Sequence, residues 1–393
     1  ESCNVSTNNI AYYYTIDEPF RGTFDAFGKL QTYMLSQSNR KIITCIDMKD
    51  HDVVKPNPLP SFYQPELFIK EAMPERILID NYPLQEWGTG SNLIQWNDNV
   101  NSGTGVQNKI QSLVLTPYQR IAEFIKNNST YHNTELFYCP QIFGEKSNGG
   151  YWKYVPPPKN MTKCLQLLPL CYGADGILSF TIASNRADNY YGSYTRYAPL
   201  IHEEDFSDIH IDPDWSAYQM LKEANDKINV YGPIIRGLTW DNADAIMVDG
   251  LHQNVSINDF GLDSLAVISL SNPSHPYEGY VQCGYYHTAT NKYFMLVNRR
   301  AVFRSDGQSG VLPDNVDASF TVAPNQNVQF TFNSITVAQY GGCLGLFDPY
   351  SHEICISENN RHVRVSLDAG DGSLRQIVSV LPANFNCVAD SLN

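Results

Sequence analysis

With 393 residues, the chain is longer than one hydrophobic core usually grows, so we expect two domains. Its formal net charge of -14 and isoelectric point near 5.0 argue against a nucleic-acid partner, because binding to a phosphate backbone needs a concentrated basic surface. No stretch approaches about 20 uninterrupted apolar residues, so the sequence predicts neither a membrane span nor a membrane partner.

The cysteines and sequons favour an extracellular, oxidising setting. The nine cysteines include no Cys-x-x-Cys pair and the histidines show no ligand spacing, so we expect no metal and no other cofactor. We expect some disulfides, with Cys343 and Cys355, which flank a turn, as a local pair and one thiol left over. The first residue, Glu1, suggests a processed product that has lost an export signal. Asn-x-Ser/Thr sequons begin at Asn4, Asn127, Asn128, Asn160 and Asn254.

Through about residue 240, strand-like and helix-like segments alternate, which is typical of parallel βα units. The first strand, over 10–16, ends at Asp17-Glu18-Pro19, because Pro19 has no amide hydrogen to continue a ladder. Further strands are predicted over 41–47, 76–80, 135–141 and 177–182. Helices are predicted over 24–37, 64–71, 116–126, 162–172 and 215–231. Residues 1–242 therefore read as five-eighths of a (β/α)8 barrel.

Two of these helices carry clear end signals. Thr116 is expected to cap the helix over 116–126, with Pro117 in its first position. Asp214 is expected to cap the helix over 215–231, and Gly232-Pro233 is expected to stop it.

The pattern changes at about residue 243, where strands of period two alternate with turns rich in Gly, Asn and Asp. These strands are predicted over 264–270, 280–286, 293–297, 319–322, 327–332, 363–367 and 375–380. Short strands at this spacing argue for an antiparallel β-sandwich over residues 243–393. The fold class is therefore α/β plus all-β, with a partial barrel followed by a sandwich.

Acidic residues lie at or just beyond the carboxyl ends of the predicted parallel strands. They are Glu18, Asp47 and Asp80, while Gln141 ends the fourth strand and Glu145 follows four residues later. The carboxyl ends of parallel barrel strands form the rim on which active sites are assembled, so these acids are candidate catalytic groups. Beside Asp17 in a partly desolvated cleft, Glu18 would keep its proton to a higher pH, as a group that protonates a leaving oxygen must.

Four segments together resemble TIM-barrel glycoside hydrolases of the large retaining superfamily. They are Tyr-Tyr-Thr-Ile-Asp-Glu-Pro at 13–19, Ile-Leu-Ile-Asp-Asn-Tyr-Pro at 77–83, Phe-Tyr-Cys-Pro-Gln at 137–141 and Tyr-Gly-Ala-Asp-Gly-Ile-Leu-Ser-Phe-Thr at 172–181. The segment from 280 to 299 also resembles the small β-sandwich that often follows such barrels. The resemblance implies that the five strands are about strands 4 to 8 of the barrel. It also implies that Glu18 is the general acid and base and that the substrate is a poly- or oligosaccharide.

This sequence departs from the family pattern at two positions. Asp17 replaces the Asn that contacts the sugar 2-hydroxyl in the family, and Gln141 stands where the family has its nucleophilic Glu. For the second carboxyl group, Asp80 and Glu145 rank equally and Asp47 follows; a capping or buried role for each stays open.

Other residues near the strand ends are expected to bind substrate. They are Asp17, Asp47, Tyr82, Trp87, Gln141 and Trp152, and the aromatic rings among them, like those of Trp96 and Tyr154, could stack on sugar faces. Packing of these rings in the core or at the rim is the other interpretation.

A barrel of five strands exposes two edges, which must be paired or covered. We therefore expect an N-terminal segment or a partner chain to complete the barrel by pairing with the first strand, with an open sheet as the alternative. Two functions remain: a secreted glycoside hydrolase that uses paired carboxylates, or a catalytically degenerate extracellular protein with a structural or carbohydrate-binding role.

Overall fold

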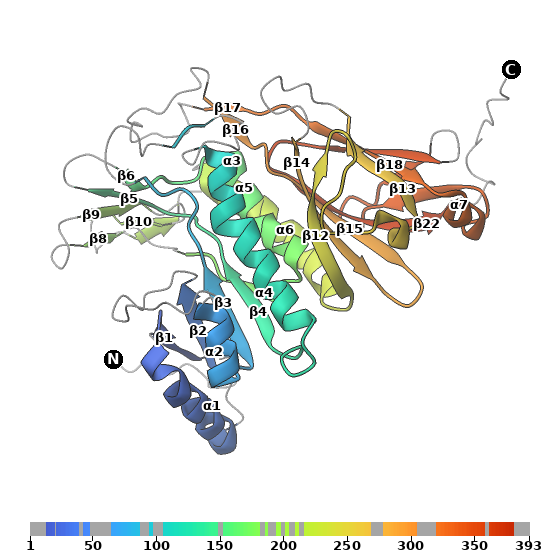
Figure 1. Ribbon diagram of the computed structural model, residues 1–393. Coiled ribbons are helices and arrows are strands. Elements are labelled where there is room, and N and C mark those ends of the chain that lie inside the picture. Colours follow the sequence, from blue (N-terminus) through green and yellow to red (C-terminus); the bar gives the residue numbers. More distant parts are fainter. Residues whose placement is uncertain are drawn as a thin grey trace, which may run out of the picture.

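A five-stranded parallel sheet and two antiparallel sheets, of six and three strands, form the framework of the computed structural model. Figure 1 shows the parallel sheet on one side, the antiparallel sheets on the other, and helices α4, α5 and α6 between them. The structure describes residues 13–19, 21–38, 42–47, 64–86, 94–96, 105–147, 152–180, 185–187, 194–197, 201–203, 209–211, 216–268, 278–304, 320–357 and 361–380.

The parallel sheet has five strands in chain order, and each neighbouring pair is parallel. They are β1 (Tyr13–Asp17), β2 (Ile42–Asp47), β3 (Arg76–Asp80), β4 (Glu135–Cys139) and β7 (Gly176–Ile177). The predicted parallel strands are therefore confirmed in number and order. Only β7 is much shorter than expected, although an isolated parallel bridge joins Gln141 to Phe180 beyond it.

The two faces of this sheet differ because side chains alternate along each strand. One face, which includes Ile42, Ile46 and Ile77, packs against α1 (Phe24–Ser38) and α2 (Gln64–Ala72). The opposite face carries a separate buried cluster, which we call the thiol face. It consists of Ile43, Cys45, Leu78, Phe137 and Cys139.

The predicted helix over 116–126 is confirmed as α4 (Thr116–Lys126), but Thr116 is not its cap. A continuous helix runs through α3 (Val106–Ile110), the π-helix η3 (Gln111–Leu115) and α4 (Thr116–Lys126). The amide of Thr116 donates to the Gln111 carbonyl, so Thr116 lies inside the helix and is not its cap. Pro117 lacks an amide hydrogen, and the wider π turn before it accommodates this loss.

The predicted stop at Gly232-Pro233 is also wrong. Helix α6 (Ser216–Ile235) contains Pro233 and continues to Ile235. Tyr231 and Ile235 are buried in the core shared with α5 (Lys159–Leu167) and the following 3-10 helix η4 (Leu168–Tyr172). Burial of these side chains outweighs the loss of one backbone hydrogen bond at the last turn.

Six of the seven predicted antiparallel strands lie in two sheets that pack face to face around one core, and the seventh, over 319–322, corresponds to a strand of a separate pair. The first has the order β12 (Thr239–Met247), β14 (Glu278–His287), β15 (Lys292–Asn298), β22 (Gly372–Ser379), β19 (Leu344–Phe347) and β20 (Ile354–Ile356). The second contains β13 (Leu262–Val267), β18 (Gln326–Phe332) and β21 (His362–Leu367). Smaller elements nearby are η5 (Ile257–Phe260), α7 (Ser334–Gln339) and the pair β16 (Val302–Phe303) and β17 (Thr321–Val322).

The helices and the antiparallel sheets share a core. Tyr286, Met295, Val297 and Leu374 on the outer face of the first sheet belong to the same apolar cluster as the helices of the parallel sheet. Strand β12 crosses the predicted boundary between residues 242 and 243.

Several short strands lie in segments for which the sequence predicted only loops. A four-stranded sheet joins β6 (Trp152–Tyr154), β5 (Gly144–Ser147), β9 (Tyr194–Tyr197) and β8 (Asn185–Ala187), and a separate pair joins β10 (Ile201–Glu203) to β11 (Ile209–Ile211). Glu145 therefore lies on a strand, opposite Tyr154 and Arg196. Strands of three or four residues are too short to leave a periodic local pattern, and β5 pairs with β9 some 50 positions away.

The expected local disulfide is wrong. Cys343 and Cys355 are both reduced, as are the other described cysteines, whereas Cys3 and Cys387 lie outside the described residues. Cys355 is paired with Leu346 in the hairpin of β19 and β20. Cys343 is three residues from Leu346, which places it about 10 Å along the strand, too far for a sulfur bridge.

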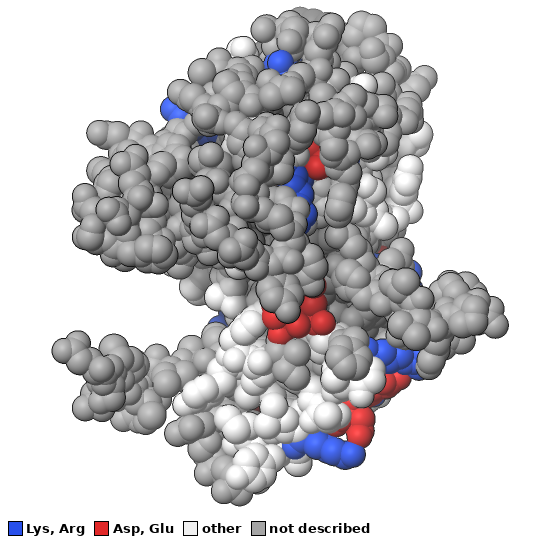
Figure 2. All heavy atoms as spheres, turned by 90° about the vertical axis from the view of Figure 1, so that its left-hand side faces the viewer, with Lys and Arg blue, Asp and Glu red and all other residues white. Residues whose placement is uncertain are grey.

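Figure 2 shows the face of the molecule that lies on the left of Figure 1, where acidic and basic side chains adjoin. Ion pairs of the N-terminal region include Arg21 with Glu71 at 3.3 Å and Lys29 with Asp25 at 2.5 Å. The described side chains on this face form no continuous basic surface. Within the described chain, none of the helices has the length and apolar character needed to cross a membrane.

Candidate active site

The register of the parallel sheet places three acidic residues at its carboxyl edge. Asp17 of β1 is the backbone neighbour of Cys45, and Asp80 of β3 lies between Asp47 and Cys139. Laterally paired residues in a sheet share a face, so the side chains of Asp17 and Asp80 lie on the thiol face. The side chain of Asp47 lies outside the described part of the structure.

An irregularity in β1 brings Asp17, rather than Glu18, onto this face. The register between β1 and β2 shifts between Tyr14 and Asp17, which moves Asp17 opposite Cys45. Its carboxylate accepts a hydrogen bond of 2.5 Å from the Tyr14 hydroxyl. With Tyr14 opposite Ile43, a regular strand would have placed residue 16 opposite Cys45 and Glu18 next on the same face, so sequence alternation alone could not identify Asp17.

Glu18 has an exposed side chain at the end of β1. Its backbone adopts a φ of 45°, a left-handed conformation that is strained for a non-glycine residue. The Glu18 amide donates to the Cys45 carbonyl at 3.0 Å, which holds this conformation against β2. This hydrogen bond holds Glu18, with its exposed side chain, at the carboxyl edge of the sheet beside β2.

Asp80 is 7 % exposed and lies near the thiols of Cys45 and Cys139 and the hydroxyl of Tyr82, on whose pKa values its charge acts. It hydrogen-bonds the Cys45 thiol, and the Cys139 sulfur lies 3.8 Å from the Tyr82 hydroxyl. Burial, followed by the charge of Asp80, raises the pKa of Cys139 to about 12. Burial also raises the pKa of Cys45 and Tyr82 above their ordinary values. Both thiols therefore stay protonated at neutral pH and are poor nucleophiles.

The two acids of the thiol face act on the same groups. After burial and Asp80, the charge of Asp17 contributes to the raised pKa of both Cys45 and Cys139. Asp17 is level with Leu78, two residues before Asp80 along the neighbouring strands, so the two acids share a face and an edge of the sheet without lying directly beside each other.

The side chain of Gln141, at the predicted nucleophile position, is hydrogen-bonded to backbone groups and therefore has a structural role. It is fully buried, and its amide nitrogen donates to the carbonyls of Phe143 and Val155 at 3.0 and 2.9 Å. Its carbonyl oxygen accepts from the Leu84 amide at 3.0 Å. The side chain thus joins three segments beyond the strand ends, and its polar atoms point to backbone partners.

The structure separates Glu145 and Trp152 from bulk solvent. Glu145 is 7 % exposed and pairs with Lys153, with 3.7 Å between Nζ and Oε1. Trp152 is 2 % exposed, so its ring faces are covered. Trp96 is buried in the same way and packs edge-on against Phe320. Trp87 lies outside the described residues.

Tyr82 belongs to an aromatic group beyond the ends of β3, β4 and β7. Its ring packs against those of Phe143, Tyr154 and Phe180, with centroids 5.0, 5.9 and 6.0 Å away. Tyr82, Tyr154 and Phe180 are partly exposed. These rings form a partly exposed aromatic surface beside Asp80.

Glu86 is a candidate that the sequence did not reveal. It is 3 % exposed in the segment after β3, and its Oε1 accepts from the Ile94 amide at 2.9 Å. Burial raises its pKa to about 7, although the Ile94 amide and the charges of Lys109 and Arg304 act in the opposite direction. An acid that keeps its proton near neutral pH suits general acid chemistry. Only its position after a strand end could have indicated it.

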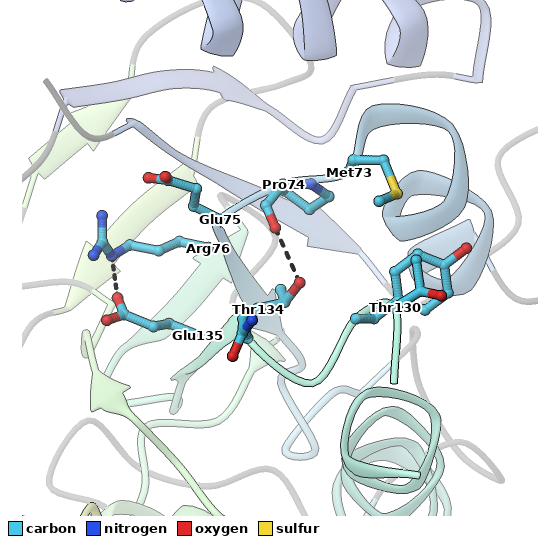
Figure 3. Close-up of a pocket in the computed structure, with 9 residues that line it drawn as sticks. Met73, Pro74, Glu75, Arg76, Thr130, Thr134 and Glu135 are labelled. Carbon is cyan, nitrogen blue, oxygen red and sulfur yellow. Dashed lines mark hydrogen bonds and ion pairs between the residues drawn. The ribbon is translucent and has the colours of Figure 1, made fainter. Parts of the chain in front are cut away.

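A pocket of about 320 Å³ opens at the opposite edge of the sheet. Figure 3 shows Arg76, at the start of β3, directed toward its ion-pair partner Glu135 at the start of β4. The Thr134 hydroxyl donates to the Pro74 carbonyl at 3.0 Å. These residues lie at the amino ends of the strands. In parallel barrels the active site is at the other, carboxyl end, and residues at the amino ends contribute to stability. Among the described residues, no group of His, Cys, Asp or Glu is arranged to hold a metal ion.

No protein-family profile and no curated protein matches this sequence. In structure, the chain is similar to TIM-barrel glycoside hydrolases that carry a following β-sheet domain. One is an α-amylase from Geobacillus thermoleovorans in complex with acarbose, with 12 % identity, a TM-score of 0.38, and coverage of 90 % of this chain and 62 % of that chain. Another is α-galactosidase I from Mortierella vinacea, with 9 % identity, a TM-score of 0.39, and coverage of 92 % and 65 %.

A third similar structure is a GH42 β-galactosidase from G. stearothermophilus, with 10 % identity, a TM-score of 0.44, and coverage of 90 % of this chain and 66 % of that chain. The chain spans less than two thirds of the length of each of these three proteins. At such low sequence identities the similarity concerns the fold alone.

Proposed function

We propose that this chain is part of a secreted glycoside hydrolase that cleaves glycosidic bonds in a poly- or oligosaccharide with paired carboxyl groups. The observation that carries the proposal is the placement of Asp17 and Asp80 on one face at the carboxyl ends of parallel strands. Glu18 emerges at the same edge in a strained backbone conformation, which is common at functional sites.

In this proposal the acids have different roles. Glu18, which is exposed, protonates the leaving oxygen, as the resemblance in sequence implies. Asp80, or Glu145 if the segment that carries it moves, serves as the second carboxyl group. Asp17 takes the place of the family's Asn and orients the sugar, while Tyr82 contributes an aromatic surface beside Asp80.

A second candidate function is a catalytically degenerate extracellular protein that binds carbohydrate or has a structural role. Two observations favour it. Gln141 stands where the resemblance implies a nucleophile, and its polar atoms are already engaged by Leu84, Phe143 and Val155. A buried amide with these partners cannot perform nucleophilic chemistry.

Turnover of a panel of aryl glycosides and oligosaccharides distinguishes the two functions. For the hydrolase, we expect sugar release by the wild-type protein and its loss in Glu18→Gln and Asp80→Asn. Asp25→Asn, which changes an exposed acid on α1 paired with Lys29, is the matched control and should keep full activity. Turnover that survives both rim substitutions would remove these acids from the mechanism. Binding of glycans without any turnover would favour the second function.

The proposal includes an N-terminal barrel segment or partner chain that pairs with β1. In the described sheet β1 has one neighbour, β2, and β7 is the other outer strand. A long outer strand is a template for further pairing. Native mass spectrometry of the protein from its source should give a mass above the 44.3 kDa of this chain. An active particle of this chain alone would contradict the completed barrel.

A further inference from the structure

A second pocket, of about 640 Å³, lies between the helix that ends in α4 and the first antiparallel sheet. Gln111, Gln119 and Glu123 line it from the helix, and Asp244 and Gln282 line it from β12 and β14. We propose that this pocket binds a small neutral polyhydroxylated molecule, such as a mono- or disaccharide. The pocket is separate from the carboxyl edge of the parallel sheet, so the inference does not depend on the proposed hydrolase.

Gln282 is the first observation that points to a ligand. Its neighbours in β14, Val281 and Cys283, are buried in the core between the antiparallel sheets. Side chains alternate along a strand, so Gln282 faces the opposite side, toward the helix and the pocket. Gln282 is only 3 % exposed, and its amide, to which the described chain supplies no hydrogen bond, is presented to the pocket that it lines.

Two further buried groups at the pocket have the same character. Tyr172, from η4, is 1 % exposed, and its hydroxyl has no hydrogen-bond partner among the described residues. Asp244 is 6 % exposed; its Oδ2 accepts from the Gln253 and Asn254 amides at 3.0 and 3.4 Å. Within the described structure its Oδ1 accepts no such bond. An amide, a hydroxyl and a carboxylate oxygen are thus available to one occupant.

The chemistry of these groups selects the class of ligand. A sugar hydroxyl both donates and accepts, so it can satisfy the carboxylate of Asp244 and the amide of Gln282 at once. Asp244 and Glu123 disfavour an anion, while the guanidinium of Arg120 is already paired with Glu66. The volume is within the range of small-molecule sites. Leu115 and Met247 provide apolar surface for the carbon skeleton.

The test is calorimetric titration of the full chain with D-galactose and with maltose, using methylammonium and inorganic phosphate as charged probes. We expect one or both sugars to bind and neither charged probe to compete. Gln282→Leu should weaken sugar binding at least about tenfold, which corresponds to about one hydrogen bond lost. Gln253→Ala removes an exposed side chain from the pocket wall and leaves its backbone bond to Asp244, so it should weaken binding without a risk to folding.

Two control variants separate this pocket from general effects. Asp25→Asn, which changes an exposed acid on α1 outside the pocket, should leave the binding measured here unchanged. Gln376→Leu, on β22 outside the pocket, should also bind normally. Equal affinity of the wild type and both pocket variants would overturn the proposal, and so would absence of sugar binding or preference for methylammonium or phosphate.

Discussion

Replacing Gln141 by leucine is expected to lower the free energy of unfolding by about 3 to 6 kcal/mol, because three buried backbone groups would lose their partner. The groups are the Leu84 amide and the carbonyls of Phe143 and Val155, and each of these residues is at most 2 % exposed. Leucine has nearly the volume of glutamine, so the loss comes from hydrogen bonding and not from a cavity. Urea unfolding followed by tryptophan fluorescence measures it.

Gln141→Glu is the more informative companion variant. A glutamate at this position still accepts from the Leu84 amide, but its second oxygen faces the carbonyls of Phe143 and Val155. Ionisation of that buried carboxyl would be unfavourable, so the variant should be less stable at pH 8 than at pH 5 and should gain no hydrolase activity. Gln376→Leu, a partly exposed glutamine on β22, should change stability by less than about 0.5 kcal/mol. Equal stability of Gln141→Leu and this control would rule out the structural role.

Glu86 is expected to make the free energy of unfolding depend on pH. Burial raises the pKa of Glu86 from 4.5 to about 7 in the folded protein. Below pH 4.5 the carboxyl is protonated in both the folded and unfolded states and imposes no cost. As the pH rises through 7, the folded state must ionise it against burial, so this group lowers stability by about 3 kcal/mol above pH 7.

Glu86→Gln is therefore expected to stabilise the protein at pH 8 by up to about 3 kcal/mol and to change little at pH 4. The glutamine still accepts from the Ile94 amide. Because the charge of Glu86 supports that of the partly buried Lys109, the gain should be largest where Lys109 is also neutral. Urea unfolding at several pH values measures the difference. Glu353→Gln, an exposed acid, should shift stability equally at both pH values. A Glu86→Gln effect independent of pH would exclude the raised pKa.

Local sequence patterns identified the main elements because burial leaves a period in the chain. The apolar run before Asp17 and the run at 76–80 became β1 and β3, and helical spacing predicted α1 and α2 almost to their ends. Turn signals divided the strands of the antiparallel sheets in the same way. Prolines were less reliable as signals of helix ends, because Pro117 and Pro233 both lie inside helices that tertiary packing stabilises.

The candidate site was predictable only to the level of strand ends. The sequence placed acids at the carboxyl edge, but a shift of register in β1 decided that Asp17, and not Glu18, joins Asp80 and the two thiols. Likewise, the raised pKa of Glu86 depends on how closely distant segments cover it. The reduced state of Cys343 and Cys355 follows from their offset in a hairpin.

By itself, then, the sequence determined that five parallel strands precede antiparallel ones and that carboxylates follow the strand ends, because alternation and periodicity are local properties of the chain. Tertiary structure alone decided which of those carboxylates share a face, why Gln141 is committed to backbone partners, and where Gln282 and Tyr172 meet an open pocket. Register, burial and hydrogen bonding between segments depend on contacts between residues far apart in the chain, for which no local pattern exists.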